Sequence, residues 1–423
     1  MTPPAWTSLV TGVNPGRHNI FGFSQPVGSQ MRIVNRILRK APPVWDNLEG
    51  ECVKVVVNVP MTYPVSKING CIVADSLTLV REGEWVWPKE EQAHLERLGY
   101  DACLMSHISE VRGPRQLEAS TEVRGEVFLQ LEEKYQPCFS MVVFSETDWV
   151  QHIFPNNVKY ISSVYKRVDR FLGKLLSILE RDSQIMIVSD HGFRVAKRKF
   201  FVNNWLSRIG LLKVNNLESA RTRIIGKVTS QAAVLLPLAV RTTPRHIRER
   251  LAPRVFSPAD HLTSIAGVYH SGWDLGQYLR LYLTDSERER YETIYTELVR
   301  SSESLVDTAT GTRPILRVLR KSDIYSGQFV VSAPDFVLEL DPLYSGNEKI
   351  LNSTESFLDY TIGIHRREGI FIAKWINSQE YVARKESLGE IDICDVAPTI
   401  AQVFGKNMRS DGQALSLFST SHS

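Results

Sequence analysis

Three short apolar segments have the length and the β-branched content of buried strands. They span residues 53–59, 141–144 and 185–188, and polar residues or a turn follow each of them. Between the second and third segments, apolar side chains recur at helical spacing over residues 158–179, directly after a pair of asparagines that can cap the helix. This order of strand, helix and strand predicts an α/β fold with parallel strands.

The character of the sequence changes after Phe193, where basic residues become frequent and residues 241–254 are rich in arginine. An amphipathic helix is predicted over residues 285–305. We then expect two strands and a helix closed by Gly405, at residues 336–340, 369–375 and 395–404. These changes divide the chain into a catalytic α/β core of residues 1–195 and 325–423 and an inserted cap of residues 196–324.

The charge balance argues against a nucleic-acid-binding surface. The 423 residues include 50 basic and 47 acidic side chains, which leaves a formal net charge of +3. We therefore expect no specific nucleic-acid binding. No segment approaches the roughly 20 consecutive apolar residues that a membrane span requires, so no membrane span is expected either.

The cysteines are odd in number and widely spaced, without a CxxC pair. They are Cys52, Cys71, Cys103, Cys138 and Cys394. This usage predicts reduced core thiols. The opening residues 1–12 show neither the charged nor the apolar region of a signal peptide. Together these features predict a cytoplasmic protein.

Acidic and histidine side chains follow two of the predicted strands. Asp148 and His152 come after residues 141–144, and the adjacent Asp190 and His191 come after residues 185–188. Ligands of open α/β sheets gather at the carboxyl ends of the strands. The spacing of four between Asp148 and His152 would place both side chains on one face of a helical turn, which suits a metal ion.

Each pair has a plainer interpretation when it is taken alone. Asp148 can be a capping residue and His152 a surface histidine, while the SDHG sequence around Asp190 can be a polar turn that leaves a strand. The presence of two such pairs at the ends of neighbouring strands favours metal binding.

The opening sequence TPPAWTSLVTG, residues 2–12, is typical of a helix start. Thr2 stands in the capping position and Pro3 follows it at the first helical position. Thr2 can simply cap the helix, and its chemistry alone favours that role. Alternatively, a hydroxyl at the positive end of a helix beside a metal ion can act as a nucleophile.

The same segments resemble motifs of the type I phosphodiesterase and nucleotide pyrophosphatase branch of the alkaline phosphatase superfamily. TPPAWTSLVTG followed by NPGRH is similar to the nucleophile motif. The DxxxH sequence of Asp148 and His152 and the SDHG sequence around Asp190 resemble the metal-binding pairs. His365 in GIHRREGIF resembles the last metal-binding histidine, and NVPMTYP and DVAPTIAQVFG are also similar to the family. The motifs follow in the family order over nearly the whole chain.

This resemblance implies an alkaline phosphatase-like, mostly parallel sheet flanked by helices, with an inserted cap and two divalent metal ions. It implies that Thr2 is the nucleophile and forms a phosphothreonine intermediate. The ligands would be Asp148, His152 and His365 for one metal and Asp190, His191 and Thr2 for the other. Histidine and carboxylate ligands suit zinc, with manganese or iron as alternatives.

Two positions depart from the family pattern. The family has an asparagine soon after the nucleophile that helps to hold a phosphate oxygen, but Phe23 stands at the matching position. Asn14 or a backbone NH group are the alternatives for this role. The family also has an aspartate at the end of an initial strand well before the nucleophile, and this sequence has no counterpart before Thr2. We therefore expect that the N-terminal strand is missing, together with one ligand of the second metal.

The sequence thus predicts a metal-dependent hydrolase that cleaves phosphodiester or nucleotide pyrophosphate bonds in a small phosphorylated substrate. The CxPxR or SxPxR motif of a sulfatase is absent from TPPAW, and related phosphoglycerate mutases use serine. The alternative is an N-terminally truncated or non-catalytic homologue that keeps the fold with little turnover. The retained Thr2 and the five other ligands favour the enzyme.

Overall fold

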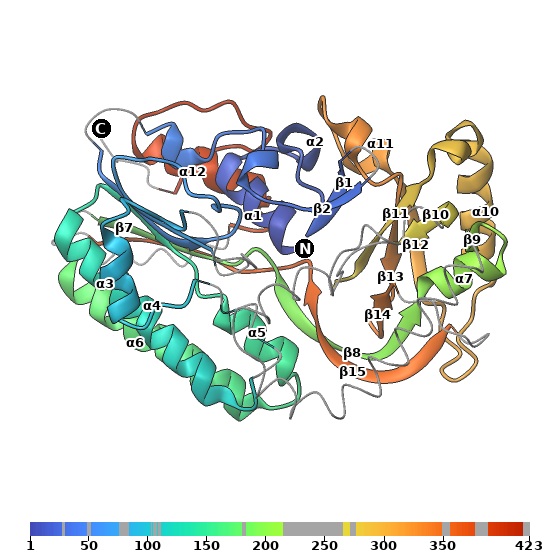
Figure 1. Cartoon of the computed structure of the whole chain (residues 1–423), viewed down its shortest axis with the longest axis horizontal. Coiled ribbons are helices and arrows are strands. Elements are labelled where there is room, and N and C mark those ends of the chain that lie inside the picture. The colour runs from blue at the N-terminus through green and yellow to red at the C-terminus, as the bar shows by residue number, and fades with distance from the viewer. Residues whose placement is uncertain are drawn as a thin grey trace.

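The structure is a computed structural model in which an α/β core is joined to a second sheet by a long, curved pair of antiparallel strands (Figure 1). It describes residues 1–27, 30–48, 52–75, 84–102, 104, 108, 111–179, 183–214, 265–270, 276–348, 356–376 and 388–417. The arginine-rich stretch at 241–254 and Cys103 lie outside these residues. Among the helices that are described, none combines the length and apolar character needed to cross a bilayer.

The core sheet has the strand order β5-β4-β3-β6. Its strands are β3 (Lys54–Val59), β4 (Gly70–Ala74), β5 (Val86–Trp87) and β6 (Phe139–Val142). β3 pairs in parallel with both β4 and β6, and β5 is antiparallel at one edge. Every residue of β3 is buried, as is usual for a parallel strand that is covered on both faces. The predicted α/β fold with parallel strands is confirmed.

Helices cover both faces of the core sheet (Figure 1). One face carries α3 (Glu91–Arg97), α4 (Pro114–Tyr135) and α6 (Val158–Ile178), and the other carries α1 (Thr2–Thr11) and α12 (Val396–Val403). Apolar residues of both layers join the strands in one hydrophobic cluster, which includes Leu9, Val56 and Leu131. The helices predicted at 158–179 and 395–404 are therefore confirmed, with ends that differ by one residue.

One expected strand partnership differs from the structure. β7 (Ser183–Val188) lies where the sequence predicts it but pairs antiparallel with β16 (Phe371–Ile376), and no described strand pairing joins it to β6. The predicted strand at 369–375 thus exists as β16. The alternation of strands and helices gives the order of the elements, whereas the hydrogen-bonding partner of β7 depends on a segment that lies far away in the sequence.

The second sheet is antiparallel and has the order β12-β13-β11-β10-β9. Its strands are β9 (Leu212–Val214), β10 (Ile265–His270), β11 (Tyr278–Leu283), β12 (Ile315–Arg320) and β13 (Phe336–Leu340). Side chains of β9, β11, β12 and β13 form a second hydrophobic cluster with α7 (Val202–Arg208) and α10 (Tyr291–Ser304). β13, which the sequence places in the core segment, pairs here with β11 and β12. The domain division at 196 and 324 stays a prediction.

The strand pair between the two sheets is formed by β8 (Gly192–Phe201) and the antiparallel β15 (Phe357–Arg366), which lie far apart in the sequence, with β14 (Tyr344–Asn347) parallel to β8 (Figure 1). Its register places His365 opposite Phe193. The end of β15 therefore lies beside the start of β8, directly after His191.

The remaining elements are short: α2 (Pro15–His18), β1 (Ser24–Val27), β2 (Gln30–Ile33), η1 (Arg36–Leu38), η2 (Val44–Asp46), α5 (Glu146–Ile153), η5 (Asp285–Arg290), α11 (Lys321–Ile324), η6 (Val330–Ser332) and η7 (Ile393–Asp395).

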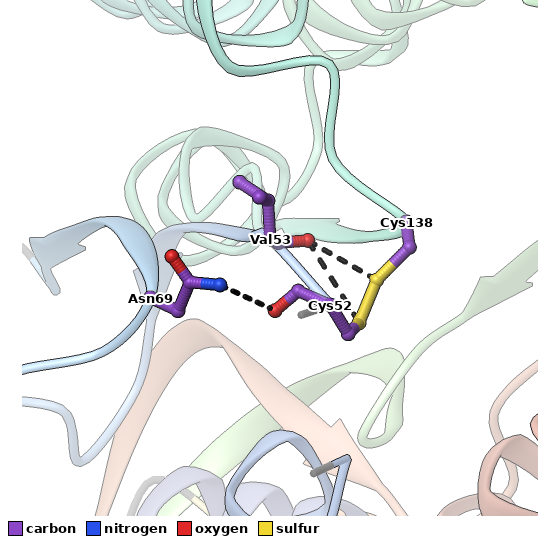
Figure 2. The surroundings of a disulfide bond; sticks show 4 residues. All are labelled: Cys52, Val53, Asn69 and Cys138. Atoms are coloured by element: carbon purple, nitrogen blue, oxygen red, sulfur yellow. Dashed lines mark hydrogen bonds between the residues drawn. A yellow bond between two sulfur atoms is a disulfide. The ribbon is translucent and has the colours of Figure 1, made fainter. Parts of the chain in front are cut away.

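The prediction of reduced thiols is wrong for two cysteines. Cys52 and Cys138 form a disulfide between positions that are 86 residues apart (Figure 2). Each cysteine lies just before a strand, and the pairing of β3 with β6 places Lys54 opposite Phe139 and brings the two cysteines together. The amide of Asn69 also donates a hydrogen bond to the carbonyl of Cys52 (Figure 2). Cys71 and Cys394 are free, as expected.

Candidate active site

Short contacts connect all six residues that the sequence singles out as site residues. Thr2 Oγ1 lies 3.4 Å from His191 Nε2, which is in turn 3.2 Å from Asp190 Oδ2 and 3.7 Å from Asp148 Oδ1. His365 Nε2 lies 3.2 Å from the same oxygen of Asp148 and 2.9 Å from His152 Nε2. The six side chains thus form one cluster at the carboxyl ends of β6 and β7.

Helix α5 places Asp148 and His152 on the same side, as their spacing predicts. Their Oδ1 and Nε2 atoms are 3.5 Å apart. His152 Nδ1 donates to the carbonyl of Gly363 at 2.8 Å, which leaves Nε2 as the acceptor nitrogen. A backbone group of β15 therefore fixes both the orientation and the tautomer of this imidazole.

Asp148, His152 and His365 offer ligand atoms that all lie within 4.8 Å of one another. Within the described part of the chain, Asp148 Oδ1 and His365 Nδ1 are buried and neither makes a hydrogen bond, although Asp148 Oδ1 faces three histidine nitrogens at 3.2, 3.5 and 3.7 Å. Buried polar atoms in native proteins nearly always have a partner. One carboxylate and two imidazoles that converge in this way are a ligand set that fits zinc or a similar divalent ion.

The second group lies at the end of β7 and the start of β8. Asp190 and His191 stand between these two strands, and the Nδ1 atom of His191 is 3.1 Å from the carbonyl of Gly192. The Oδ2 atom of Asp190 is buried, and no residue that the structure describes makes a hydrogen bond with it. Its position beside His191 and Thr2 suits a second cation, with Asp190 as the anionic ligand.

The pKa shifts describe a site with two acids in close proximity. Burial opposes ionisation of Asp148, but His152 and His365 outweigh this and hold the pKa of Asp148 well below its ordinary value. Burial and the charge of Asp148 raise the pKa of Asp190 to about 8. Burial lowers the pKa of His365 to about 4. Protein groups alone therefore do not keep both carboxylates ionised at neutral pH, and cations would do so.

Thr2 is not the helix cap that its chemistry suggests. It is the first residue of α1, the capping position belongs to Met1, and Met1 makes no side-chain capping bond. The hydroxyl of Thr2 is directed towards His191 instead, at the positive end of the helix. Asn14, an alternative for holding a phosphate oxygen, caps α2: its Oδ1 accepts from Gly16 N at 2.9 Å and its Nδ2 donates to the carbonyl of Ile324.

Two supporting features were not found by the sequence analysis. The ring of Phe193 packs against His152, with centroids 4.6 Å apart, and against His365 at 5.5 Å. Glu146, at the start of α5, forms a buried ion pair with Arg124 of α4. The position of Phe193 directly after SDHG is a sequence signal for the first feature, whereas nothing in the sequence links Glu146 to Arg124.

Comparison with known proteins gives a family and a fold. The family model of type I phosphodiesterase / nucleotide pyrophosphatase matches residues 1–365. Among curated proteins, none matches the sequence.

The fold is similar to that of several solved structures, all of low sequence identity. Phosphonoacetate hydrolase from Sinorhizobium meliloti 1021 is 15% identical, with a TM-score of 0.56 over 94% of this chain and 83% of that chain. Murine ectonucleotide pyrophosphatase / phosphodiesterase 5 is 12% identical, with a TM-score of 0.51 over 98% and 86%. A mutant of alkaline phosphatase PafA is 12% identical, with a TM-score of 0.54 over 98% and 89%.

These matches confirm the alkaline phosphatase-like fold and a hydrolase of the phosphodiesterase and nucleotide pyrophosphatase type. The family match covers every residue of the cluster from Thr2 to His365. The chain belongs to the type I phosphodiesterase / nucleotide pyrophosphatase family.

Proposed function

We propose that this hydrolase is metal-dependent and cleaves phosphodiester or nucleotide pyrophosphate bonds through a phosphothreonine intermediate on Thr2. The observation that supports this proposal is the contact of Thr2 Oγ1 with His191 Nε2, at 3.4 Å, within a cluster of two aspartates and three histidines. A hydroxyl so placed has no capping role in α1.

The side chains fit two divalent ions. Asp148, His152 and His365 would hold the first, and Asp190, His191 and Thr2 the second, with zinc as the favoured metal and manganese or iron as alternatives. When bound, such ions supply Lewis-acid stabilisation of the negative charge that develops on the attacking and leaving oxygens.

The chemistry of the protein groups is centred on Thr2. Its Oγ1 would attack phosphorus and release its proton to solvent, a P–O bond to Thr2 would form, and the bond to the leaving group would break as that group departs with the electron pair. Water would then cleave the phosphothreonine and restore the hydroxyl. The N-terminus of α1 stabilises negative charge on the attacking oxygen, while Gly363 and Phe193 hold His152 and His365 in place.

A small phosphorylated substrate suits this site. Murine ectonucleotide pyrophosphatase / phosphodiesterase 5 has been solved in complex with AMP, and the phosphonoacetate hydrolase with phosphonoacetate. Both ligands present one phosphate or phosphonate group. The alternative of a non-catalytic homologue is not favoured, because the family match and the retained site residues point to an enzyme.

The disulfide changes the cellular location that we propose for this protein. The cytoplasmic expectation rests on reduced cysteines, and the disulfide between Cys52 and Cys138 removes that basis. Disulfides persist mainly in oxidising compartments, so we favour such a compartment for this protein. Thiol titration of the denatured protein from its native source would test this: two fewer free thiols before reduction than after it support an oxidising compartment.

Rates of hydrolysis test the activity itself. Purified protein with Zn²⁺ or Mn²⁺ should hydrolyse bis-p-nitrophenyl phosphate faster than p-nitrophenyl phosphate, and a chelator should abolish both activities. Faster hydrolysis of the monoester would overturn the proposed preference for diesters. Activity that survives chelation and complete loss of metal would overturn the metal dependence.

A further inference from the structure

Asn58 is a buried asparagine near the end of β3 whose backbone conformation few residues other than glycine adopt. The residue is completely buried, and its φ angle of 58° lies in the left-handed region. The pairing of β3 with β4 shifts register between Val57 and Val59, so Asn58 sits in an irregularity of the strand. Asparagine tolerates a left-handed φ better than most residues, and backbone strain of this kind is concentrated at functional sites.

The amide of Asn58 joins the end of β3 to the turn between β6 and α5. Its Nδ2 atom donates to the carbonyl of Val143 at 2.7 Å and to Oγ of Ser145 at 3.0 Å. The neighbouring backbone bond runs from the NH of Val143 to the carbonyl of Val57 at 3.1 Å. The two hydrogens of one amide nitrogen therefore continue the link between the strands into the turn that starts α5.

Ser145 connects this amide to the metal-binding candidates. It stands at the capping position of α5, but its side chain makes no capping hydrogen bond, and its Oγ accepts from Asn58. The carbonyl of Ser145 accepts from the backbone NH groups of Asp148 and Trp149, each at 3.1 Å. Two successive hydrogen bonds thus lead from Asn58 to the backbone of Asp148, and His152 follows in the next turn of the helix.

Neither a substrate contact nor the turn after β3 accounts for this amide. Asn58 is completely buried, and both hydrogens of its Nδ2 atom are donated to protein acceptors. The turn has hydrogen bonds of its own: Oγ1 of Thr62 donates to the carbonyl of Val59 at 2.7 Å, and the NH of Thr62 donates to Asp75 at 3.2 Å. What the Asn58 amide holds in place is therefore the start of α5.

We propose that Asn58 is a positioning residue for the metal site. By fixing the first turn of α5, it holds Asp148 and His152 where their ligand atoms converge with that of His365, which comes from β15. This inference rests on the proposed function, in which these three residues bind one ion. Ligands that are already ordered bind more tightly, because less conformational freedom is lost on binding.

Asn58→Gly tests the role of the amide. Glycine adopts a left-handed φ readily, so this variant removes the two hydrogen bonds and keeps the backbone conformation. We expect the Kd for Zn²⁺, measured by competition with a chromogenic chelator, to rise by about ten-fold, as when other residues that orient metal ligands are removed. Zinc affinity equal to that of the wild type would overturn the proposal.

Asn19→Gly is the matched control. Asn19 is also a buried asparagine with a left-handed φ, of 66°, and its Nδ2 atom donates to the carbonyl of Leu38 at 3.3 Å. That bond joins the end of α2 to η1 and not to α5. Its Kd for Zn²⁺ should stay within about two-fold of the wild-type value, because the ligand helix keeps its link to β3. An equal loss of affinity in both variants would show a general effect of removing a buried amide and would overturn the proposal.

Ser145→Ala tests the route from Asn58 to the helix. It should raise the Kd for Zn²⁺ by about three-fold, the effect of one hydrogen bond, since Asn58 keeps its bond to Val143. In the Asn58→Gly background, Oγ of Ser145 has already lost its donor, so the same substitution should add less than about two-fold. Effects that multiply in full would show that the two residues act independently and would overturn this route.

Hydrogen exchange separates this inference from the proposed function. In the metal-free protein, Asn58→Gly should speed amide exchange over α5, while Asn19→Gly should leave it unchanged, because only the first variant frees the start of that helix. If the wild-type protein binds no Zn²⁺, the proposed metal dependence fails, and faster exchange confined to α5 would still support the positioning role of Asn58. Unchanged exchange over α5 in Asn58→Gly would overturn that role.

Discussion

The guanidinium of Arg124 holds the carboxylate of Glu146 at the buried start of α5, two residues before Asp148. Nη2 of Arg124 lies 2.7 Å from Oε1 of Glu146, Nε is 3.2 Å from both carboxylate oxygens, and neither side chain is more than 2% exposed. Ser120 donates to the same carboxylate at 2.5 Å. Because Arg124 and Ser120 belong to α4, this network fixes α5 and its two metal-binding candidates relative to α4.

We predict that Glu146→Gln lowers both stability and metal affinity. It leaves the buried charge of Arg124 without its anion, and such a change costs about 3–5 kcal/mol of unfolding free energy. The combined variant Glu146→Gln with Arg124→Met should regain most of this stability, because no isolated charge remains. Its metal affinity should stay reduced, since α5 has lost its link to α4. Denaturant unfolding and metal titration check the two effects, and normal metal affinity in the combined variant would limit the pair to a structural role.

Asp148 and Thr2 should respond differently to substitution. Asp148→Ala removes the carboxylate shared by His152, His191 and His365, so metal and activity should be lost together. Thr2→Ala should reduce turnover by roughly three orders of magnitude or more and leave the metal content nearly unchanged, because a neutral hydroxyl is the weakest ligand. Metal analysis together with diester hydrolysis distinguishes the two outcomes.

Thr7→Ala is a matched control in the same helix. The hydroxyl of Thr7 donates to the carbonyl of Pro3 at 2.6 Å and does not contact the cluster. Its removal should cost about 1 kcal/mol of stability with turnover within about two-fold of the wild type. A large residual activity in Thr2→Ala would assign Thr2 a structural role like that of Thr7.

The sequence predicts the residues of the site better than it predicts the residues that hold them in position. The spacing of Asp148 and His152 indicates their shared face because both lie on one helical turn, and this is a local property. Only the family resemblance indicates His365, because this residue reaches the other two through the register of β15 with β8, which is not a local property. The pairing of Glu146 with Arg124 depends on how α5 packs on α4, for which the sequence carries no signal.

The same distinction separates correct and incorrect predictions of the fold. β3 and α6 are recognisable from their own apolar patterns, and they form within a few residues of the predicted positions. The antiparallel pairing of β7 with β16 and the disulfide between Cys52 and Cys138 depend on which strands become neighbours. The spacing of the cysteines gives no sign of this disulfide, because the two thiols meet only through the parallel pairing of β3 with β6.

His18 should make the protein sensitive to mild acid. It is fully buried, its Nδ1 accepts from the backbone NH of Ile20 at 3.1 Å, and its Nε2 lies 3.0 Å from Ser8 Oγ. Protonation of Nδ1 would place a second proton against the NH of Ile20. Burial, with a contribution from the charge of Arg39, lowers the pKa of His18 from 6.5 to about 3.

The unfolded chain therefore binds the proton of His18 more readily than the folded protein between pH 6.5 and about 3. The stability is complete above this range and falls as the pH decreases, by about 2 kcal/mol from this residue at pH 5. In His18→Asn, an amide oxygen can still accept from Ile20, and the difference in unfolding free energy between pH 8 and pH 5 should shrink by about that amount. An equal difference in both proteins would show that His18 is not responsible.

The disulfide should stabilise the fold without taking part in catalysis. It joins the amino-terminal sides of β3 and β6, whereas Asp148 follows the carboxyl end of β6, so the strand separates the two sites. Closing a loop of this length restricts the unfolded chain, and such bonds typically contribute about 2–4 kcal/mol. We expect Cys52→Ser with Cys138→Ser to lower the unfolding free energy by about this amount and to remove its dependence on reductant.

The control variant Cys394→Ser replaces a free thiol, so its unfolding free energy should still depend on reductant. At a temperature at which both proteins remain folded, the double variant should keep the wild-type kcat for the diester; a reduced kcat in folded protein would show that the amino-terminal sides of these strands influence the site at their other end.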